Sequence, residues 1–531
     1  MKTPLEVLQN YRPHNGTLDD AFASRCAKEA DRVFLIQGES EMTWQEFGTQ
    51  YKKLARALAA RGVSHGDRVA LIGRNDTSHV LALFALARLG AIMVPINPEF
   101  GERELNYALG HAEVTGIIAD AALEGVIRHS AGQLAVAPWM LTWGAVDSNE
   151  ASSLQGAMDT APDVDLDHRS VADDTCVIIY TSGTTGFPKG VMHSQRNLVT
   201  AGEANVNRVH LQPDDRAMIV LPFFHMNALF YSVGGVLAAG ASMIIEPRFS
   251  ASRFWATAAD KGATVVNIIE AIGTIICTRD REEYRKDHRL RVVYGVRRKS
   301  APVFKNEFGV AHLFSGFGMT EIPGVTCNPY DGPDKIGSMG VVGSHPDPAM
   351  PWAQCRVVDE SGHDVAVDVV GELWVKSPIV MQGYFRDPEQ TKKTFNDGWL
   401  MTGDLVRRDA DGFYFHVSRK KDIIRRRGEN IAAAELEMVI GQHAKVREAA
   451  AFAVPSELGE DDIFVAVVPK AGEDLEEAEI VAWCADRLAA TKIPRYVALT
   501  DALPYTSTHK IAKATLRDDP LIRSKAVDFQ R

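Results

Sequence analysis

The sequence is most constrained by a stretch that begins as an apolar strand and breaks into a loop of glycines and hydroxyl side chains. Residues 175–180 are mostly apolar, which predicts a buried strand. Glycine tolerates positive φ, so the backbone N–H groups of the following loop can point in one direction. Such a concave set of N–H groups, with hydroxyls beside it and a lysine after it, suits phosphate oxygens. The loop residues and the lysine are Thr181, Ser182, Gly183, Thr184, Thr185, Gly186 and Lys189.

Two other interpretations of this loop agree less well with its residues. A flexible Gly/Ser linker does not directly follow a buried strand and end in Pro-Lys-Gly before an apolar run. A Walker A loop has its lysine directly after a glycine and before Ser or Thr. Here Phe-Pro lies between Gly186 and Lys189, and a glycine follows the lysine.

Composition bounds the class of protein. The length of 531 residues exceeds what one hydrophobic core usually supports, so we expect two or more domains. The net charge of −11 argues against a nucleic-acid binder. The six cysteines are scattered without metal-ligand or redox spacing, which indicates reduced thiols and a cytoplasmic location. The polar N-terminus does not resemble a signal peptide.

Residues 228–245 are apolar and uncharged over a length that raises the question of a membrane span. Glycines and serines interrupt this run, which instead predicts a buried helix, a turn at Gly240 and a strand over 243–245. We therefore expect no membrane span.

The loop from Tyr180 to Gly190 resembles the signature loop of the adenylate-forming superfamily. This superfamily contains acyl-CoA synthetases, peptide-synthetase adenylation domains and luciferases. Further motifs follow in the family's order, so the resemblance covers nearly the whole chain. The chain is most similar to the carnitine/crotonobetaine-CoA ligase-like branch of the acyl-CoA synthetases, on residues 92–97, 224–225 and 427–430.

The resemblance implies an α/β fold, with a large layered α/β N-terminal domain and a small mobile α+β C-terminal domain. We expect the AMP-binding adenylation domain, which takes ATP and the acyl substrate, at 1–420, and the lid domain with the catalytic lysine at 421–531. Alternating apolar strands and helices over residues 67–118 independently predict parallel α/β layers. Residues 131–167 are interpreted as irregular acidic surface, and residues 476–490 as a helix.

The second motif surrounds Phe317 with two glycines, Gly316 and Gly318. Glycines beside an aromatic side chain let backbone approach a flat ligand, and an aromatic face stacks on any base. Thr320 can reach a phosphate, and Glu321 can hold Mg²⁺ as a hard oxygen ligand. A glycine-flanked turn without a ligand is the alternative. The family usually has Tyr at the position of Phe317, and stacking survives that change whereas a phenol hydrogen bond does not.

The third motif places a carboxylate, Asp404, after a glycine at a strand end. A carboxylate there suits two neighbouring hydroxyls, and the resemblance implies that it binds ribose. The resemblance also implies a phosphate or ribose contact by Arg419 and a domain hinge at Lys421. The alternatives are a turn aspartate and a solvated run of charges.

Two further motifs lie in the predicted lid domain. Residues 425–431, which include Gly428, resemble the loop that contacts pantetheine in CoA ligases. The arginines of this loop either contact CoA phosphates or are simply exposed. Residues 503–513 resemble the family's lysine loop, in which Lys510 takes the catalytic position and His509 replaces the usual glycine. Outside this motif, a lysine at that position would be interpreted as a solvated side chain.

Three segments are candidate walls of a pocket for the acid: residues 225–230, 267–273 and 316–325. The histidine of the first segment follows a strand end, where α/β proteins bind ligands, and matches the family's His motif. A core histidine is the alternative. The candidate pocket residues are His225, Asn227, Glu270 and Gly316.

Glu270 is a lone carboxylate among apolar residues. It either faces outward or caps a helix, or it is a counter-charge or hydrogen-bond partner for a polar or cationic acyl group.

The implied reaction joins a small-molecule carboxylate, ATP and coenzyme A. The acid and ATP give an acyl-AMP and pyrophosphate, and attack by the CoA thiol then gives acyl-CoA and AMP. No nucleophilic Ser or Cys is required, because the work is electrostatic and positional. Lys189 and Mg²⁺ offset phosphate charge, Thr320 and Glu321 support them, and Lys510 meets the charge that develops between the carboxylate and the α-phosphate.

Two other functions fit parts of the pattern. One is adenylation for transfer to a carrier-protein thiol, and the lack of a fused carrier domain favours free CoA over it. The other is a nucleotide-binding sensor without catalysis, against which the intact Lys510, Glu321 and Asp404 argue. A homodimer is the candidate assembly.

Overall fold

The computed structural model describes residues 1–144, 152–164, 166, 170–181, 188–297, 299–333, 335, 337–426, 429–456, 461–505 and 511–529. The chain divides into two compact units, and neither is continuous in sequence. The first consists of Met1–Gln354 and Val375–Leu400, and the second of Cys355–Trp374 and Met401–Arg531.

The first unit contains two seven-stranded sheets, one of which carries the predicted phosphate-loop strand. Its strand order is β19-β8-β7-β4-β3-β5-β6. The pairs among β3 to β7 are parallel, whereas β8 is antiparallel to both β7 and β19. The strands are β3 (Arg68–Ile72), β4 (Ile92–Ile96), β5 (Gly116–Asp120), β6 (Trp139–Trp143), β7 (Thr175–Thr181), β8 (Lys189–Ser194) and β19 (Gly383–Tyr384).

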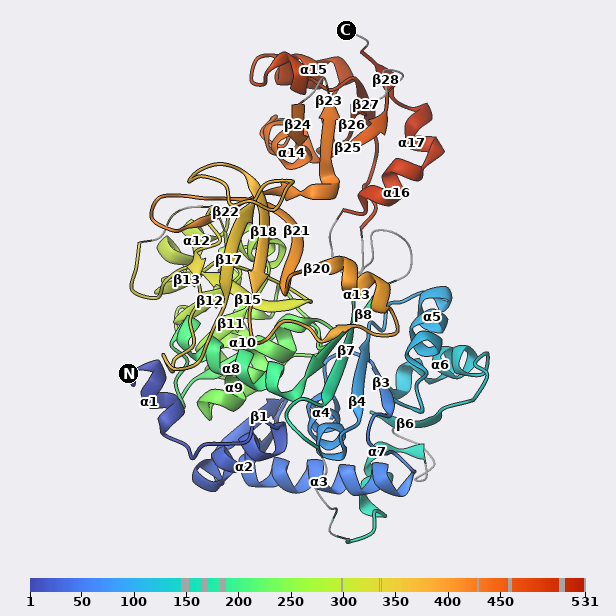
Figure 1. The fold of residues 1–531 in the computed structure, drawn as a ribbon, viewed down its shortest axis with the longest axis vertical. Coiled ribbons are helices and arrows are strands. Elements are labelled where there is room, and N and C mark those ends of the chain that lie inside the picture. The colour runs from blue at the N-terminus through green and yellow to red at the C-terminus, as the bar shows by residue number, and fades with distance from the viewer. Residues whose placement is uncertain are drawn as a thin grey trace. The chain divides into compact units, whose positions relative to one another are not determined.

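Helices cover both faces of this sheet, because successive side chains of a strand point to opposite faces. Ala70 and Ile72 of β3 belong to one buried cluster with Leu105 and Ile127, whereas Val69 is buried on the other face. In Figure 1, α5 and α6 lie on one side of the strands, and α4 lies on the other with α3 beyond it. The helices are α3 (Trp44–Ala60), α4 (Thr77–Leu89), α5 (Glu102–Ala112), η1 (Ala121–Leu123), α6 (Glu124–Ala131) and α7 (Leu154–Asp159).

The second seven-stranded sheet has the order β13-β12-β11-β9-β10-β1-β2 and is parallel except for the pair β1-β2. Its strands are β1 (Val33–Gln37), β2 (Ser40–Thr43), β9 (Arg216–Ile219), β10 (Ser242–Ile245), β11 (Val265–Asn267), β12 (Val292–Tyr294) and β13 (His312–Phe314). The associated helices are α1 (Pro4–Gln9), α2 (Leu18–Glu29), α8 (Gln195–Val209), η3 (Asn227–Val233), α9 (Gly234–Ala239), α10 (Phe254–Asp260), α11 (Glu270–Thr278), η4 (Arg281–Glu283) and α12 (Ala301–Asn306).

The apolar run at 228–245 folds as the sequence predicts. It forms the π-helical turn η3, then α9, which ends at Gly240 with φ 68°, and then the buried strand β10. A left-handed glycine at this position is a common helix stop, because no Cβ opposes that conformation. Across the described part of the chain, none of the helices has the length and apolar character that crossing a membrane requires.

An antiparallel hairpin carries the second motif at the end of β13. It consists of β14 (Gly316–Met319) and β15 (Ile322–Cys327), and β16 (Val341–Val342) pairs with β15. The remaining elements of the first unit are α13 (Pro388–Thr394) and β20 (Phe395–Asn396).

Most of a further sheet belongs to the second unit: β18 lies between β17 and β21, and β22 pairs antiparallel with β21. After the turn η5, strands β23 and β24 form a hairpin. These elements are β17 (Gln354–Val358), β18 (Gly371–Lys376), β21 (Trp399–Arg408), β22 (Tyr414–Arg419), η5 (Lys420–Asp422), β23 (Ile423–Arg426) and β24 (Glu429–Ala432).

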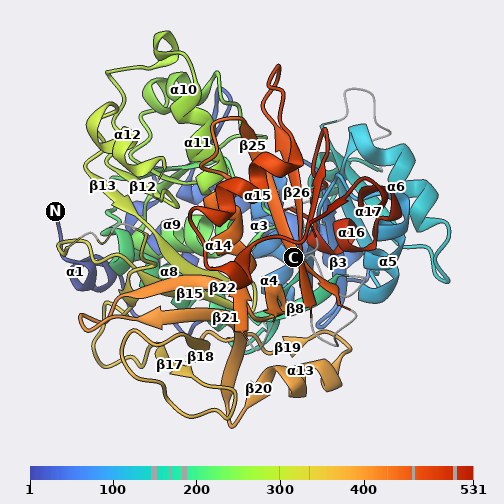
Figure 2. The same ribbon diagram turned by 90° about the horizontal axis from the view of Figure 1, so that it is seen from above.

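A four-stranded sheet, β25-β26-β27-β28, forms the rest of the second unit and is covered on both faces. Val465 and Val467 of β26 belong to the cluster that includes α14 and α15, whereas Phe464 and Ala466 face α16 and α17. Figure 2 shows these two helix pairs on opposite sides of the strands. The elements are α14 (Ala433–Ile440), β25 (Val446–Pro455), β26 (Asp461–Pro469), α15 (Glu477–Ala485), η6 (Ala490–Lys492), β27 (Tyr496–Leu499), α16 (Lys513–Asp518), α17 (Pro520–Ser524) and β28 (Val527–Asp528).

Two predictions about secondary structure were wrong. Residues 131–167, interpreted as irregular, contain β6, which extends the parallel sheet beside β5, and α7, which Ser153 caps. The helix predicted over 476–490 ends at Ala485, because the chain turns into η6 before β27. For β6, pairing with a neighbouring strand decides what the local pattern leaves open.

Helices α8 and α9 pack through two glycines, which yields our first prediction. A Cβ on Gly202 would lie 2.2 Å from the carbonyl oxygen of Gly234, so Gly202→Ala forces the helix backbones apart. We expect it to lower the free energy of unfolding by about 1–3 kcal/mol. The measurement is urea unfolding followed by tryptophan fluorescence.

The matched control is Gly125→Ala in α6, where a Cβ meets nothing within 4 Å. Alanine favours a helix over glycine, so this variant should be unchanged or more stable by up to about 1 kcal/mol. Equal stability of the two variants would contradict the proposed close contact.

Candidate active site

Tyr384 brings the lysine of the first motif and the glutamate of the second motif together. Strand β19 pairs with β8, and Lys189 Nζ lies 5.2 Å from the centroid of the Tyr384 ring. The Tyr384 hydroxyl donates a 2.8 Å hydrogen bond to Oε1 of Glu321, which is 8 % exposed. Burial, followed by the Glu321 charge, raises the pKa of Tyr384, so the phenol stays protonated and remains a donor.

His193 fixes the backbone of the second motif. Its Nε2 donates to the carbonyl oxygen of Thr320 at 2.6 Å, and its Nδ1 accepts from Asn197 Nδ2 at 3.0 Å. The side chain is fully buried, and burial lowers the pKa of His193 to about 4. The imidazole is therefore neutral at pH 7, with the proton on Nε2. Neither this histidine nor Tyr384 stands out in the sequence, because their partners are far away along the chain.

The glycines of the second motif make room for two tyrosines. A Cβ on Gly316 would lie 2.5 Å from the Tyr294 hydroxyl, and a Cβ on Gly318 would lie 2.5 Å from the Tyr231 hydroxyl. Phe317 between them is 8 % exposed. Close packing of the hairpin is thus one reason for the glycines, and stacking of adenine on Phe317 stays a prediction.

Asp404 of the second unit is a buried carboxylate that accepts hydrogen bonds from the described residues through only one of its two oxygens. Strands β21 and β22 pair Asp404 with Arg419, whose Nε lies 2.9 Å from Oδ1. His416 Nε2 donates to the same oxygen at 3.0 Å. The residue is 2 % exposed, and Oδ2 has no hydrogen-bond partner among the described residues. A buried acceptor in this state is suited to ligand hydroxyl donors.

A second carboxylate positions the backbone around Asp404. Glu372 accepts from the backbone N–H of Gly403 at 3.1 Å and from Lys420 Nζ at 3.0 Å. Gly403 has φ 71°, a conformation that glycine adopts without strain. Glu372 and His416 are the positioning residues that sequence reasoning missed in this unit.

His225 and Asn227, two of the predicted acid-pocket residues, differ in the contacts that they make. The backbone N–H of His225 donates to Pro222, and its partly exposed ring lies 4.5 Å from that of Phe224, so it is not a fully buried core histidine. Asn227 begins η3, and its buried Oδ1 has no partner within the described structure. An open acceptor at this position is consistent with a ligand-binding wall.

Glu270 has the capping role that the sequence left open. Its carboxylate accepts from the backbone N–H groups of Arg297, Lys299 and Ser300 at 2.6–3.2 Å, and from the Ser300 hydroxyl at 2.6 Å. With both oxygens engaged, Glu270 orders the loop that leads into α12.

Several predicted site residues lie outside the described residues, and their roles stay predictions. They are Ser182, Gly183, Thr184, Thr185, Gly186, Gly428 and Lys510.

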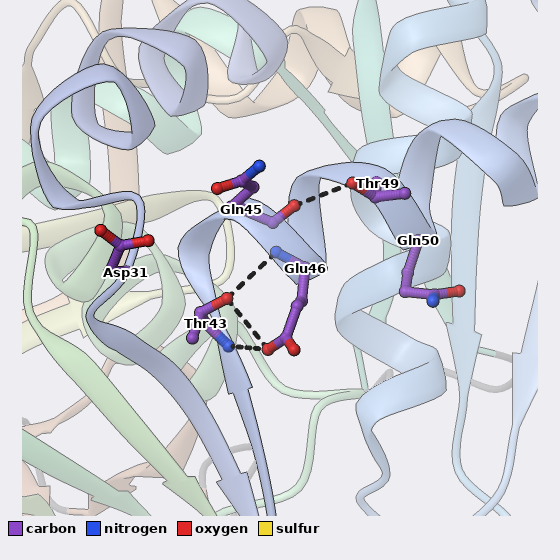
Figure 3. Close-up of a pocket in the computed structure, with 6 residues that line it drawn as sticks. All are labelled: Asp31, Thr43, Gln45, Glu46, Thr49 and Gln50. Carbon is purple, nitrogen blue, oxygen red and sulfur yellow. Dashed lines mark hydrogen bonds between the residues drawn. The ribbon is translucent and has the colours of Figure 1, made fainter.

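A surface pocket of about 390 Å³ lies elsewhere, at the start of α3 (Figure 3). The Thr43 hydroxyl accepts from the backbone N–H of Glu46, and the Glu46 carboxylate accepts in return from Thr43. These polar groups form the N-terminal capping box of α3, and none of the predicted site residues lines the pocket.

The sequence was compared with family models. The model described as AMP-binding enzyme matches residues 22–385, and the model described as AMP-binding enzyme C-terminal domain matches residues 435–510. The chain belongs to the AMP-binding enzyme family. The predicted membership of the adenylate-forming superfamily and the predicted two-part α/β fold are confirmed.

Full-length relatives agree with this assignment. The feruloyl-CoA synthase of Amycolatopsis sp is 32% identical over 489 residues, which covers 90% of this chain and 94% of that protein. The crotonobetaine/carnitine–CoA ligase of Proteus mirabilis is 27% identical over 534 residues, covering 95% and 99%. The crystal structure of ATP-bound MatB from Rhodopseudomonas palustris superimposes with a TM-score of 0.84 at 29% identity, covering 94% of this chain and 98% of that chain.

This AMP-binding enzyme is an acid–thiol ligase that uses ATP and CoA and forms acyl-CoA through an acyl-adenylate. The residues also fit the Mg²⁺ that such enzymes use. Within the described ranges, no group of three or more His, Cys, Asp or Glu side chains forms a metal cage. Mg²⁺ typically needs only one or two carboxylates plus substrate phosphates, and the metal role of Glu321 stays a prediction.

The buried, neutral His193 gives stability a defined pH dependence. Its folded pKa of about 4 lies below the ordinary histidine value of 6.5, so the unfolded chain takes up the proton first as the pH falls. The stabilisation is complete above pH 6.5 and is lost as the pH falls toward 4. Between pH 7 and pH 5 we expect this histidine to cost roughly 2 kcal/mol of unfolding free energy, measured by urea titration.

The control is His193→Gln, whose amide can still donate to Thr320 but does not titrate. Its unfolding free energy should fall less over the same range. His79 is also buried with its pKa lowered to about 4 by burial, so part of the dependence will remain. Identical pH slopes in the two proteins would contradict the assignment to His193.

Proposed function

We propose that the predicted motif residues carry out the two half-reactions of this ligase. Lys189, Thr320 and Glu321 bind the phosphate end of ATP, Asp404 binds the ribose hydroxyls, and Lys510 acts at the reacting carboxylate. The observation that carries the proposal is the open Oδ2 of Asp404, a buried anionic acceptor without a partner in the described structure. The remaining predicted phosphate-loop residues are assigned to the same phosphates.

In the first half-reaction, a carboxylate oxygen of the acid attacks the α-phosphorus of ATP, and the bond to pyrophosphate breaks. Negative charge shifts onto the leaving group, where Lys189 is suited to offset it. Glu321 would hold Mg²⁺, which supplies further charge neutralisation when bound. Lys510 stabilises the charge that develops between the carboxylate and the α-phosphate.

In the second half-reaction, the CoA sulfur attacks the acyl carbonyl carbon, the thiol proton is released and AMP leaves with the carbonyl–oxygen bond electrons. No covalent enzyme intermediate is involved. Gly428 and the arginines before it are proposed to line the approach of CoA. Both curated relatives described above are named as CoA ligases or synthases, which favours free CoA over a carrier protein.

We also propose that the residues after Lys421 move between the half-reactions, because Lys510 and CoA both need access to the same carbonyl. Lys421 lies in the short turn η5, between the sheet of β21 and β22 and the hairpin of β23 and β24. The ion pair of Arg425 with Glu360 joins the parts on either side, and both side chains are well exposed. Such exposed pairs stabilise little, which is compatible with a hinge.

The acid, the assembly and the location need separate proposals. The two relatives are named for different acids, so family membership alone does not assign the acid. The four hydrogen bonds of Glu270 support a role in ordering a loop over one as an acyl counter-charge.

A cytoplasmic location is supported by six unpaired cysteines. The homodimer remains a proposal, which sedimentation analysis tests.

The ribose assignment predicts a nucleotide-specific defect. Asp404→Asn should raise the KM for ATP about 10- to 100-fold, because a charged acceptor for the hydroxyls becomes neutral. The same variant should discriminate less between ATP and 3′-deoxy-ATP than the wild type does. Steady-state pyrophosphate release measures both quantities.

The control is Asp368→Asn, which changes a well-exposed carboxylate paired with Arg407 in the same unit. It should leave the KM for ATP unchanged. An Asp404→Asn enzyme that retains the wild-type preference for ATP over 3′-deoxy-ATP would refute the ribose contact.

Domain movement predicts that two substitutions separate the half-reactions. Lys510→Ala should slow acyl-AMP formation by orders of magnitude, yet leave CoA attack on supplied acyl-AMP largely intact. If Lys421→Pro holds the enzyme in the adenylating arrangement, it should slow CoA attack and leave acyl-AMP formation largely intact. Proline fixes φ near −65° and so removes the backbone freedom that a hinge needs. Single-turnover kinetics of each half-reaction are the measurement.

Lys525→Ala, at an exposed position of the same unit, serves as the control and should affect neither step. Equal slowing of both half-reactions by Lys510→Ala would rule out the alternation.

A further inference from the structure

The first unit contains a buried arginine beside the second motif. Arg208 lies in the last turn of α8 and is 8 % exposed. Its Cζ is 4.7 Å from the centroid of the Tyr231 ring and 5.8 Å from that of Tyr294. A Cβ on Gly324 would come within 2.0 Å of its Nη2, so the absence of a side chain there leaves room for the guanidinium.

Arg208 has no counter-ion within the described ranges. No carboxylate of the described residues is paired with it and its buried Nη1 has no hydrogen-bond partner there, although the guanidinium shares a hydrogen bond with the Tyr231 side chain. The guanidinium stays protonated at any physiological pH. Burial raises the pKa of the Tyr231 and Tyr294 phenols, and burial raises the pKa of the Cys327 thiol to about 12. These neighbours are therefore neutral and supply no negative charge.

A second buried arginine, Arg25, offers a comparison. Arg25 stacks on Tyr11 at 5.0 Å, and its Nη2 donates to the carbonyl oxygen of Ala238 at 3.2 Å, while its Nε and Nη1 have no partner among the described residues. The carboxylate of Glu203 is also close enough to raise its pKa against the lowering caused by burial. A tyrosine face and a phenol hydrogen bond compensate only part of the cost of burying a cation, and no described carboxylate is paired with Arg208.

The guanidinium lies where the three proposed walls of the acid pocket meet. Tyr231 belongs to η3, which continues the first wall. The adjacent Ser232 accepts a 2.9 Å hydrogen bond from Asn267 of the second wall. Gly318, which touches Tyr231, and Gly324, which touches Arg208, both belong to the third. The unpaired charge is thus next to the site proposed for the acyl group.

We propose that Arg208 binds a second anionic group of the substrate, and that the acid is a dicarboxylic acid or another carboxylic acid with a second negative charge. The planar guanidinium fork matches a carboxylate with two parallel hydrogen bonds, and a buried carboxylate there supplies the missing counter-ion. The inference rests on the ligase function and names its substrate class. The other carboxylate of the acid is the one that is adenylated.

The first experiment uses the wild-type enzyme with matched substrates. A series of dicarboxylic acids of increasing chain length is compared with the monoamide of each, which has nearly the same shape and lacks the second charge. We expect kcat/KM for acyl-CoA formation to be about 10- to 100-fold higher for the best diacid than for its monoamide. Equal or better use of the monoamides would overturn the proposal without any variant.

The second experiment tests the residue. Arg208→Met should abolish the preference for the diacid, and Arg208→Lys, which keeps a charge but loses the planar fork, should retain part of it. The matched control is Arg25→Met, which also removes a buried arginine stacked on a tyrosine and should keep the preference. Thermal unfolding without substrates adds a readout, because replacing an unpaired buried charge by an apolar side chain is often neutral or stabilising.

The outcomes separate the alternatives. A purely structural Arg208 predicts a lower melting temperature for Arg208→Met with an unchanged diacid preference. A contact to the reacting carboxylate predicts an equal loss for diacids and monoamides. Either result overturns the proposal. If no acid of either kind supports pyrophosphate release, the ligase function itself fails, whereas turnover of neutral acids alone removes only the second-anion subsite.

Discussion

Strand β8 pairs antiparallel with β7 on one edge and with the two-residue strand β19 on the other. This pairing adds a reversed strand to an otherwise parallel layer, so the chain returns along the phosphate-loop strand. Lys189 is consequently fixed at the start of β8, opposite Thr181, and next to Tyr384 of β19. Farther along β8, His193 reaches the backbone of Thr320. One strand thus connects the first motif to the second, and the first unit's part of the site depends on its register.

Within each unit, the carboxylates of the predicted site residues are held by neutral or oppositely charged partners. The Glu321 carboxylate accepts from a phenol, and one oxygen of Asp404 accepts from an imidazole beside a guanidinium. These contacts orient each carboxylate while leaving capacity for a ligand. Arg208 differs, since aromatic faces and glycines surround it and none of the carboxylates in the described ranges is paired with it. This difference between Arg208 and the site carboxylates points to a ligand as the partner of Arg208, because a folded chain rarely leaves a buried charge unpaired.

Local pattern predicted much of the fold, because strands, caps and glycine stops are set by neighbouring residues. The strand that begins at Thr175 and the turn at Gly240 are examples. Strand β6 was missed, because it is fixed by pairing with β5 and its residues show no clear alternation of burial.

The site could be predicted only as far as its motifs are contiguous. Glu321 and Asp404 were predicted as site residues, but their neighbours Tyr384 and His193 were not singled out, because each contacts a motif from more than 60 residues away in sequence. His416 is nearer to its partner, yet it reaches Asp404 only through the pairing of β21 with β22. The family resemblance supplied the role of Lys510, which composition and spacing alone would leave as a solvated lysine.

The position of β19 in the chain has a consequence for synthesis on the ribosome. Because the segment from Val375 to Leu400 returns to the first unit, β8 emerges long before the strand that completes its outer edge. At typical elongation rates the intervening stretch takes roughly 10 to 40 seconds to produce. During that time the nascent sheet presents an unpaired strand edge, the kind of surface on which other chains can add. The last edge of the phosphate-binding layer is closed only after most of the protein has been made.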